Sequence, residues 1–126
     1  MSSIYGCYTG SHSSSWALVV DGEIVSCLEE ERFTRIKAGD NYDSNAELSA
    51  VEIQKVSGIK FTESDYNLFV EPVPKSFAKK ITKDRYEVVS HHDAHAYGAY
   101  FTSGFEGKTM TITHDGGGEN MMMKMY

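Results

Sequence analysis

Short runs of apolar residues alternate with polar turns along most of this chain. Runs of this length between turn residues are typical of β-strands, because a buried strand needs fewer residues than a buried helix. The sequence predicts strands at 4–9, 16–20, 23–28, 67–70, 86–90 and 109–113, with 120–125 as a return strand. Asp21-Gly22 separates the second and third strands and is a strong signal for a two-residue hairpin turn.

Helical spacing occurs in fewer places. Between Ser44 and Ser57 apolar residues recur at helical spacing, with Ser44 as the candidate cap and Gly58 as the candidate stop. A second helix is expected over 92–101, and a turn of basic helix over 75–80. A strand-rich opening followed by helices predicts an α/β fold with a mixed sheet.

One pattern occurs twice. Residues 4–20 and residues 109–125 each read as a strand, a small polar turn and a second strand. Many folds contain two hairpins, so this repeated pattern does not identify a fold unless specific motifs accompany it.

Composition narrows the class of protein. The 126 residues are 40% hydrophobic and 24% charged, as in a soluble domain with a modest core. The net charge of −6 offers no attraction to nucleic acid or an anionic membrane, so neither is expected as a partner. No apolar run approaches the roughly 20 residues of a membrane helix, and no signal peptide is recognised. A cytoplasmic protein is expected, with Cys7 and Cys27 as buried free thiols.

The densest local chemistry lies in the run His91-His92-Asp93-Ala94-His95. In a helix, His91 and His95 stand at i and i+4 on one face, where two imidazoles can bind one metal ion. Surface or helix-capping histidines are the alternative. His92 and Asp93 are expected to support the ligands or to cap the helix, where a carboxylate near the N-terminus is favourable.

A second candidate is Asp115-Gly116-Gly117-Gly118-Glu119. Three consecutive glycines exceed what a two-residue turn requires, and their backbone N–H groups can face an anion. The sequence therefore predicts a phosphate-contacting loop, in which Asp115 can hold a metal or a metal-bound water. A plain hairpin turn is the alternative. A metal pair near such a loop suggests chemistry on a phosphorylated substrate.

The segment from Glu29 to Lys37 is highly charged, with Phe33 and Ile36 interrupting it. A solvated surface segment is the ordinary interpretation of such a run. Arg32 or Arg35 could instead contact an anion, because a guanidinium group binds phosphate through two parallel hydrogen bonds.

Together these motifs resemble the O-carbamoyltransferase family, which includes the nodulation and tobramycin carbamoyltransferases. The matching stretches follow the family's order and spacing: His12 to Val25, Glu29 to Lys37, His91 to Ala96, Tyr100 to Phe105 and Asp115 to Glu119. The run E-E-E-R-F-T-R-I-K is the most diagnostic of them. The resemblance covers most of this chain but only the N-terminal part of family members.

The resemblance implies a fold and a reaction. The fold would be a ribonuclease-H-like half of an actin-like, sugar-kinase-like ATPase over 1–105, with the opening hairpin of the second half at 106–126. The reaction would move a carbamoyl group from carbamoyl phosphate, through an ATP-derived carbamoyladenylate, to a hydroxyl of a small molecule. ATP and an iron-like ion, bound by two histidines and a carboxylate, would be the cofactors, with His91 and His95 as ligands. The loop of His12 borders the family's transfer site, which makes His12 the candidate general base.

Two departures from the family pattern limit these expectations. Ser13 stands where the family usually has an aspartate, and the family's metal site takes an aspartate from the second half of its domain. The isolated chain is therefore expected to be inactive. The alternative functions are an inactive fragment that docks with a separately encoded second half, or a stand-alone metal- or nucleotide-binding module. An apolar edge at 120–126 is expected to recruit that second half or a second copy of the chain.

Overall fold

The computed structural model of this chain describes residues 1–10, 12–37, 46–118 and 121–126. These residues form two compact units, Met1–Val88 and Val89–Tyr126. The first unit contains most of the sheet and its apolar core, and the second contains the histidine cluster.

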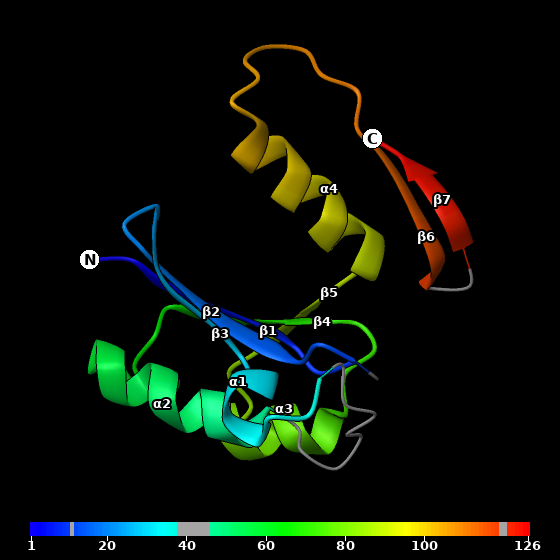
Figure 1. The fold of residues 1–126 in the computed structure, drawn as a ribbon. Coiled ribbons are helices and arrows are strands. Elements are labelled where there is room, and N and C mark those ends of the chain that lie inside the picture. Colours follow the sequence, from blue (N-terminus) through cyan, green and yellow to red (C-terminus); the bar gives the residue numbers. More distant parts are fainter. Residues whose placement is uncertain (11, 38–45, 119–120) are drawn as a thin grey trace. The chain divides into compact units, whose positions relative to one another are not determined.

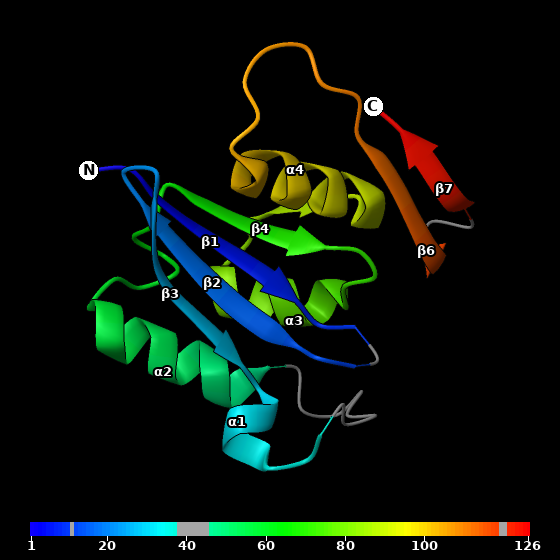
Figure 2. The ribbon, with the colours of Figure 1, turned by 45° about the horizontal axis from the view of Figure 1, so that its top comes forward.

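A mixed five-stranded sheet forms the framework of the first unit, in the order β3-β2-β1-β4-β5 (Figure 2). Its strands are β1 (Ser3–Tyr8), β2 (Ser15–Val20), β3 (Glu23–Glu29), β4 (Tyr66–Val70) and β5 (Glu87–Val89). The β2 strand pairs antiparallel with both β1 and β3, whereas β1 pairs parallel with β4. The strands expected in this part of the chain are confirmed within a residue or two at their ends.

The turn between β2 and β3 has the predicted hairpin geometry. Asp21 and Gly22 have φ values of 49° and 87°, both in the left-handed region that a tight hairpin turn of this kind requires. The Asp21 carboxylate also accepts a hydrogen bond of 2.7 Å from the backbone N–H of Ser2, which ties the turn to the start of β1.

Three helices accompany this sheet: α1 (Glu31–Thr34), α2 (Glu47–Ser57) and α3 (Lys75–Thr82). Helices α2 and α3 lie on the same face of the sheet (Figure 1). Gly58 ends α2 with a φ of 72°, as predicted, whereas the proposed cap Ser44 lies outside the described residues.

The start of α2 is instead stabilised by a residue distant in sequence. The buried Glu30 carboxylate accepts hydrogen bonds from the backbone N–H groups of Leu48 and Ser49, at 3.1 and 2.8 Å, and from the Ser49 hydroxyl at 2.5 Å. A carboxylate at this position satisfies N–H groups that have no partner within the helix. The charged segment is therefore not uniformly solvated, because Glu30 has a structural task.

The core of the first unit lies between the sheet and its helices and is rich in aromatic rings. Trp16 and Phe61 stack with their centroids 4.4 Å apart, and Phe69 meets Trp16 edge to face at 5.5 Å. The Trp16 indole N–H donates to the Ala46 carbonyl at 3.1 Å, so its one polar group is also satisfied. Alternate residues of β1 and β2 point into this core, as a sheet with one covered face requires.

The two cysteines differ in environment. Cys7 is a buried free thiol, as expected. Cys27 is also free, but it is exposed, so the expectation that both thiols are buried is wrong. Cys27 belongs to β3, the outer strand of the sheet, and most side chains of that strand are exposed or half-buried.

The second unit consists of the helix α4 (His91–Ser103) and an antiparallel hairpin of β6 (Ile112–Gly118) and β7 (Met121–Met125). The helix expected at 92–101 is confirmed. The expectation that the glycine run forms a loop is wrong for Gly116 to Gly118, because these residues belong to β6. The pairing register shifts between His114 and Gly118, an irregularity that residues without side chains accommodate easily.

Candidate metal centre

The first turn of α4 positions two histidines. The Ser90 side chain accepts a hydrogen bond of 3.1 Å from the backbone N–H of Asp93, which caps the helix just before His91. The helix then brings His91 and His95 to one face, with their Nε2 atoms 3.1 Å apart. Two imidazoles that share one ion at about 2.0–2.2 Å cannot have their nitrogens much over 4 Å apart, so the predicted geometry is confirmed.

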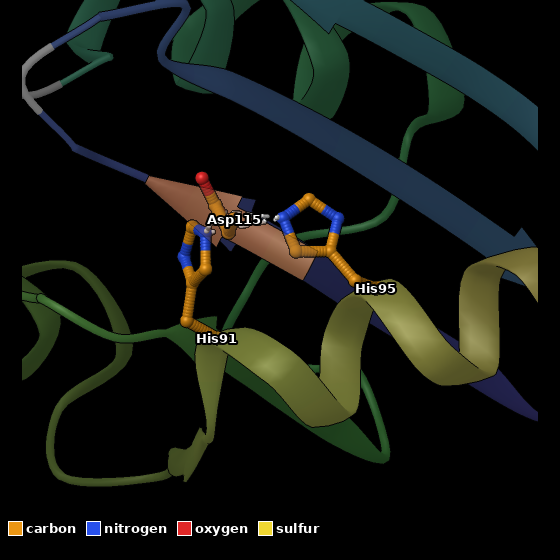
Figure 3. A group of neighbouring side chains, drawn as sticks. All are labelled: His91, His95 and Asp115. Atoms are coloured by element: carbon orange, nitrogen blue, oxygen red, sulfur yellow. Dashed lines mark hydrogen bonds and ion pairs between the residues drawn. The ribbon is translucent and has the colours of Figure 1, made fainter. Parts of the chain in front are cut away.

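Asp115 of β6 completes the cluster. Its Oδ2 atom lies 2.6 Å from His91 Nε2 and 3.3 Å from His95 Nε2, and the three side chains point toward one another (Figure 3). One donor atom from each residue lies within 4.8 Å of the others. The family resemblance implied that the carboxylate ligand comes from the second half of the domain, beyond this chain. In the structure, Asp115 of this chain already lies beside the two histidines.

The Asp115 carboxylate is held in its ionised form. A hydrogen bond with His91 is the main cause, and the backbone N–H of Gly116 donates to Oδ1 at 2.6 Å; together they lower the pKa of Asp115 from 3.8 to about 2. A carboxylate ligand must be ionised to bind a metal ion, and the lowered pKa keeps Asp115 ionised into more acidic solution than an ordinary aspartate.

The donor set fits a divalent metal ion. Two imidazole nitrogens and one carboxylate oxygen on one side of an ion are the ligands of many non-haem iron sites, where further positions stay open. The side chains of His95 and Asp115 are 56% and 35% exposed, so the group is accessible to solvent and to additional ligands. The His91 side chain is only 15% exposed and anchors the inner side of the group.

Contacts around these three residues join α4 to the hairpin. His92 is fully buried, with Nδ1 2.8 Å from the Thr113 hydroxyl. Asp93 accepts hydrogen bonds from Lys124 Nζ, at 2.6 Å, and from the Tyr126 hydroxyl, and these bonds lower the pKa of Asp93. The expected supporting role of His92 and Asp93 thus has identified partners. Sequence reasoning missed those partners, although the two-residue spacing of Thr113 and Asp115 on a strand was an available signal.

The remaining candidate residues lie elsewhere. His12, Arg32 and Arg35 belong to the first unit, and all three are exposed. The His12 ring lies 3.4 Å from the Ser13 hydroxyl, and Arg32 forms an ion pair of 3.3 Å with Glu29. Their roles as base and anion contacts stay predictions.

The role of the glycine run in anion binding is also untested, although the structure shows where these residues lie. Gly116, Gly117 and Gly118 lie in β6, and Glu119 lies outside the described residues. A Cβ atom built at Gly116 would meet nothing within 4 Å, so no close contact requires glycine there. Phosphate contact by this run stays a prediction.

Comparison with solved structures identifies the class of fold. YeaZ from Pseudomonas aeruginosa aligns with a TM-score of 0.59 at 15% sequence identity, over 82% of this chain and 51% of that one. An uncharacterized protein with similarity to peptidase YEAZ from Pseudomonas aeruginosa aligns with a TM-score of 0.57 at 16% identity, over 82% and 50%. The chain therefore has a YeaZ-like fold, and the α/β class that the sequence predicted is confirmed.

Sequence comparison adds a distant relationship. No protein-family model matches the chain. Nodulation protein NolNO of Sinorhizobium fredii is 28% identical over 139 aligned positions, which cover 88% of this chain and 20% of that protein. The match supports a distant relationship to the carbamoyltransferase family that the motifs resemble. The chain spans a fifth of this relative and about half of the two solved structures.

None of the helices in the described segments is long and apolar enough to cross a bilayer.

Proposed function

We propose that this chain is the metal-binding part of an O-carbamoyltransferase-like protein, which transfers a carbamoyl group from carbamoyl phosphate to a hydroxyl of a small molecule. The observation that carries the proposal is the convergence of His91, His95 and Asp115 within 4.8 Å. The distant similarity to a nodulation protein and the YeaZ-like fold support it from outside the site.

In this proposal each residue has a defined task. His91, His95 and Asp115 hold an iron-like divalent ion, which when bound supplies a Lewis acid for a phosphate or carbamoyl oxygen. His12 accepts the proton of the acceptor hydroxyl as that oxygen attacks the carbamoyl carbon of the carbamoyladenylate and AMP leaves.

Anion binding is the second task. Arg32 and Arg35 carry exposed guanidinium groups suited to phosphate, and the glycine run of β6 offers backbone N–H groups. ATP and carbamoyl phosphate are the anions that they would contact. The β7 edge, where Met123 and Met125 are exposed, is the proposed contact for a second half or a second copy of the chain.

One observation favours a second candidate function, a stand-alone metal-binding module. All three donor residues found among the described parts of the chain belong to the second compact unit, Val89–Tyr126. In this alternative the chain binds the ion but carries no catalytic role.

Metal binding by the purified chain is the first test. Titration with Co²⁺, a spectroscopically visible substitute for iron, should give one site, and His91→Ala or Asp115→Ala should abolish it. His114→Ala is the matched control, because His114 is adjacent to Asp115 on β6 and adjacent residues of a strand point to opposite faces. Equal Co²⁺ binding by wild type and Asp115→Ala would contradict the proposed centre.

A transfer assay separates the two candidates. The isolated chain should release no AMP or pyrophosphate from ATP and carbamoyl phosphate, since it spans a fifth of its relative. A longer protein containing this chain should show turnover that His12→Ala abolishes without loss of Co²⁺ binding. Metal binding without turnover in that longer protein would favour the stand-alone module.

A further inference from the structure

We propose that the buried pair His92 and Thr113 is a positioning pair, which fixes the register of β6 against α4 and so places the Asp115 carboxylate beside His91 and His95. The inference rests on the proposed metal function and extends it to two residues that do not themselves offer a ligand to the ion.

The pair is buried and in direct contact. His92 is 0% exposed and Thr113 is 6% exposed, and His92 Nδ1 lies 2.8 Å from the Thr113 hydroxyl oxygen. The same hydroxyl lies 3.4 Å from the Lys124 carbonyl oxygen of β7, to which it can donate. The contact therefore links the helix to both strands of the hairpin.

His92 and Thr113 lie close in sequence to the residues of the candidate metal site. Thr113 precedes Asp115 by two residues, and alternate residues of a strand point to the same face. His92 directly follows His91 on α4. A slip of one residue in β6 would bring His114 or Gly116 to the place of Asp115, because such a slip turns every side chain to the other face.

Among the described residues, few other side chains of β6 can fix that register. The three residues after Asp115 are glycines, which have no side chains to pack, and the pairing with β7 shifts between His114 and Gly118. The nearest buried side chain of β6 before Asp115 is that of Thr113, because His114 between them is exposed. A buried imidazole without its partner is costly, so the correct register is also the one in which both polar groups are satisfied.

Substitutions at Thr113 separate the hydroxyl from the shape of the side chain. Thr113→Val keeps the branched shape but removes the hydrogen bond, and it should weaken Co²⁺ binding roughly 10- to 100-fold, as loss of a supporting contact commonly does. Thr113→Ser keeps the hydroxyl and should stay close to wild type. Thr102→Val is the control, because the Thr102 hydroxyl also donates within the second unit, to the Gly98 carbonyl at 2.7 Å, but lies on the exposed part of α4.

The visible absorption spectrum of bound Co²⁺ is the second readout, since it reports ligand geometry rather than stability. Thr113→Val should change this spectrum, whereas Thr113→Ser should not. His92→Leu and His92→Asn repeat the comparison from the helix, with Asn keeping a hydrogen-bonding group near the Nδ1 position. If Thr113→Val folds poorly, the His92 variants test whether the contact between His92 and Thr113 positions Asp115.

The outcomes distinguish this inference from the proposed function. Equal Co²⁺ affinity and an equal spectrum for wild type and Thr113→Val would overturn the positioning pair while the metal centre stands. Equal weakening by Thr113→Ser and Thr113→Val would also overturn it, because the hydroxyl would then be irrelevant. A wild-type chain that binds no Co²⁺ would overturn the proposed centre, and the pair with it.

Discussion

The two units of this chain are stabilised by different kinds of contact. In Met1–Val88 the largest buried side chains are aromatic or aliphatic, and Trp16, Phe61 and Phe69 pack ring against ring. Among the described side chains of Val89–Tyr126, Ala96 is the one buried hydrophobic residue, and His92 and Thr113 are the buried polar ones. The first unit combines a large apolar core with hydrogen bonds, whereas the described part of the second unit depends mainly on hydrogen bonds and ion pairs.

This difference indicates which unit should change its stability with pH or with a bound ion. Apolar burial is non-directional and changes little with pH or bound ions. A two-stranded hairpin is marginal by itself, and here it is joined to α4 by polar contacts such as Lys124 to Asp93 at 2.6 Å. The second unit should therefore open more readily than the first, and a ligand or a proton should shift its stability.

Removal of an aromatic ring from the first unit should have the largest effect on stability. Phe69 is fully buried, so Phe69→Ala should lower the free energy of unfolding of that unit by about 3–5 kcal/mol. The chain has a single tryptophan, Trp16, in the same core, so its fluorescence during urea denaturation reports on this unit directly.

A ring of the second unit provides the matched substitution. Phe101 of α4 is 75% exposed, so Phe101→Ala should change the free energy of unfolding by no more than about 0.5 kcal/mol. If Phe69→Ala and Phe101→Ala lowered the free energy of unfolding by similar amounts, the two units would not differ in their dependence on apolar burial.

Metal binding should act on the second unit alone. Co²⁺ at 100 times its dissociation constant should slow hydrogen exchange in α4, β6 and β7 roughly 100-fold where exchange needs opening of the site, because the ion binds only the closed form. Exchange in β1 and β2 should not change. His95→Ala should abolish the added protection, and protection that spreads equally over both units would show that they do not respond separately.

The fold was largely predictable because its signals are local. The Asp21-Gly22 turn is fixed by two residues that tolerate positive φ, and Gly58 ends α2 for the same reason. The spacing of His91 and His95 predicts their common face from helix geometry alone. Each of these features needs only neighbours in the sequence.

The missed features all depend on contacts between distant segments. Glu30 stabilises the start of α2 from a position before α1, which no local cap signal reveals. The convergence of Asp115 with the histidines depends on how β6 packs against α4. Gly116 to Gly118 were expected in a loop because glycine favours turns, but pairing with β7 extends the strand through them.

Acid should have the smallest effect, and it should act through Asp115. The folded-state pKa of about 2 lies below the ordinary value of 3.8. A group with a lowered pKa stabilises the fold while it is ionised, so its contribution is complete above about pH 3.8 and is lost as pH falls through about 2. Hydrogen exchange of metal-free α4 and β6 should therefore speed up over this interval in wild type, and less so in Asp115→Asn.

The cause of the shift can be tested at the carboxyl group itself. In an NMR titration of metal-free protein, the Asp115 carboxyl carbon should have its midpoint near pH 2. Because the hydrogen bond with His91 is the largest cause and that with His95 is a smaller one, His91→Ala should raise the midpoint more than His95→Ala. A wild-type midpoint near 3.8 would mean that the 2.6 Å contact between His91 and Asp115 does not persist in solution, and the site would then have to be assembled by the metal ion rather than by the fold.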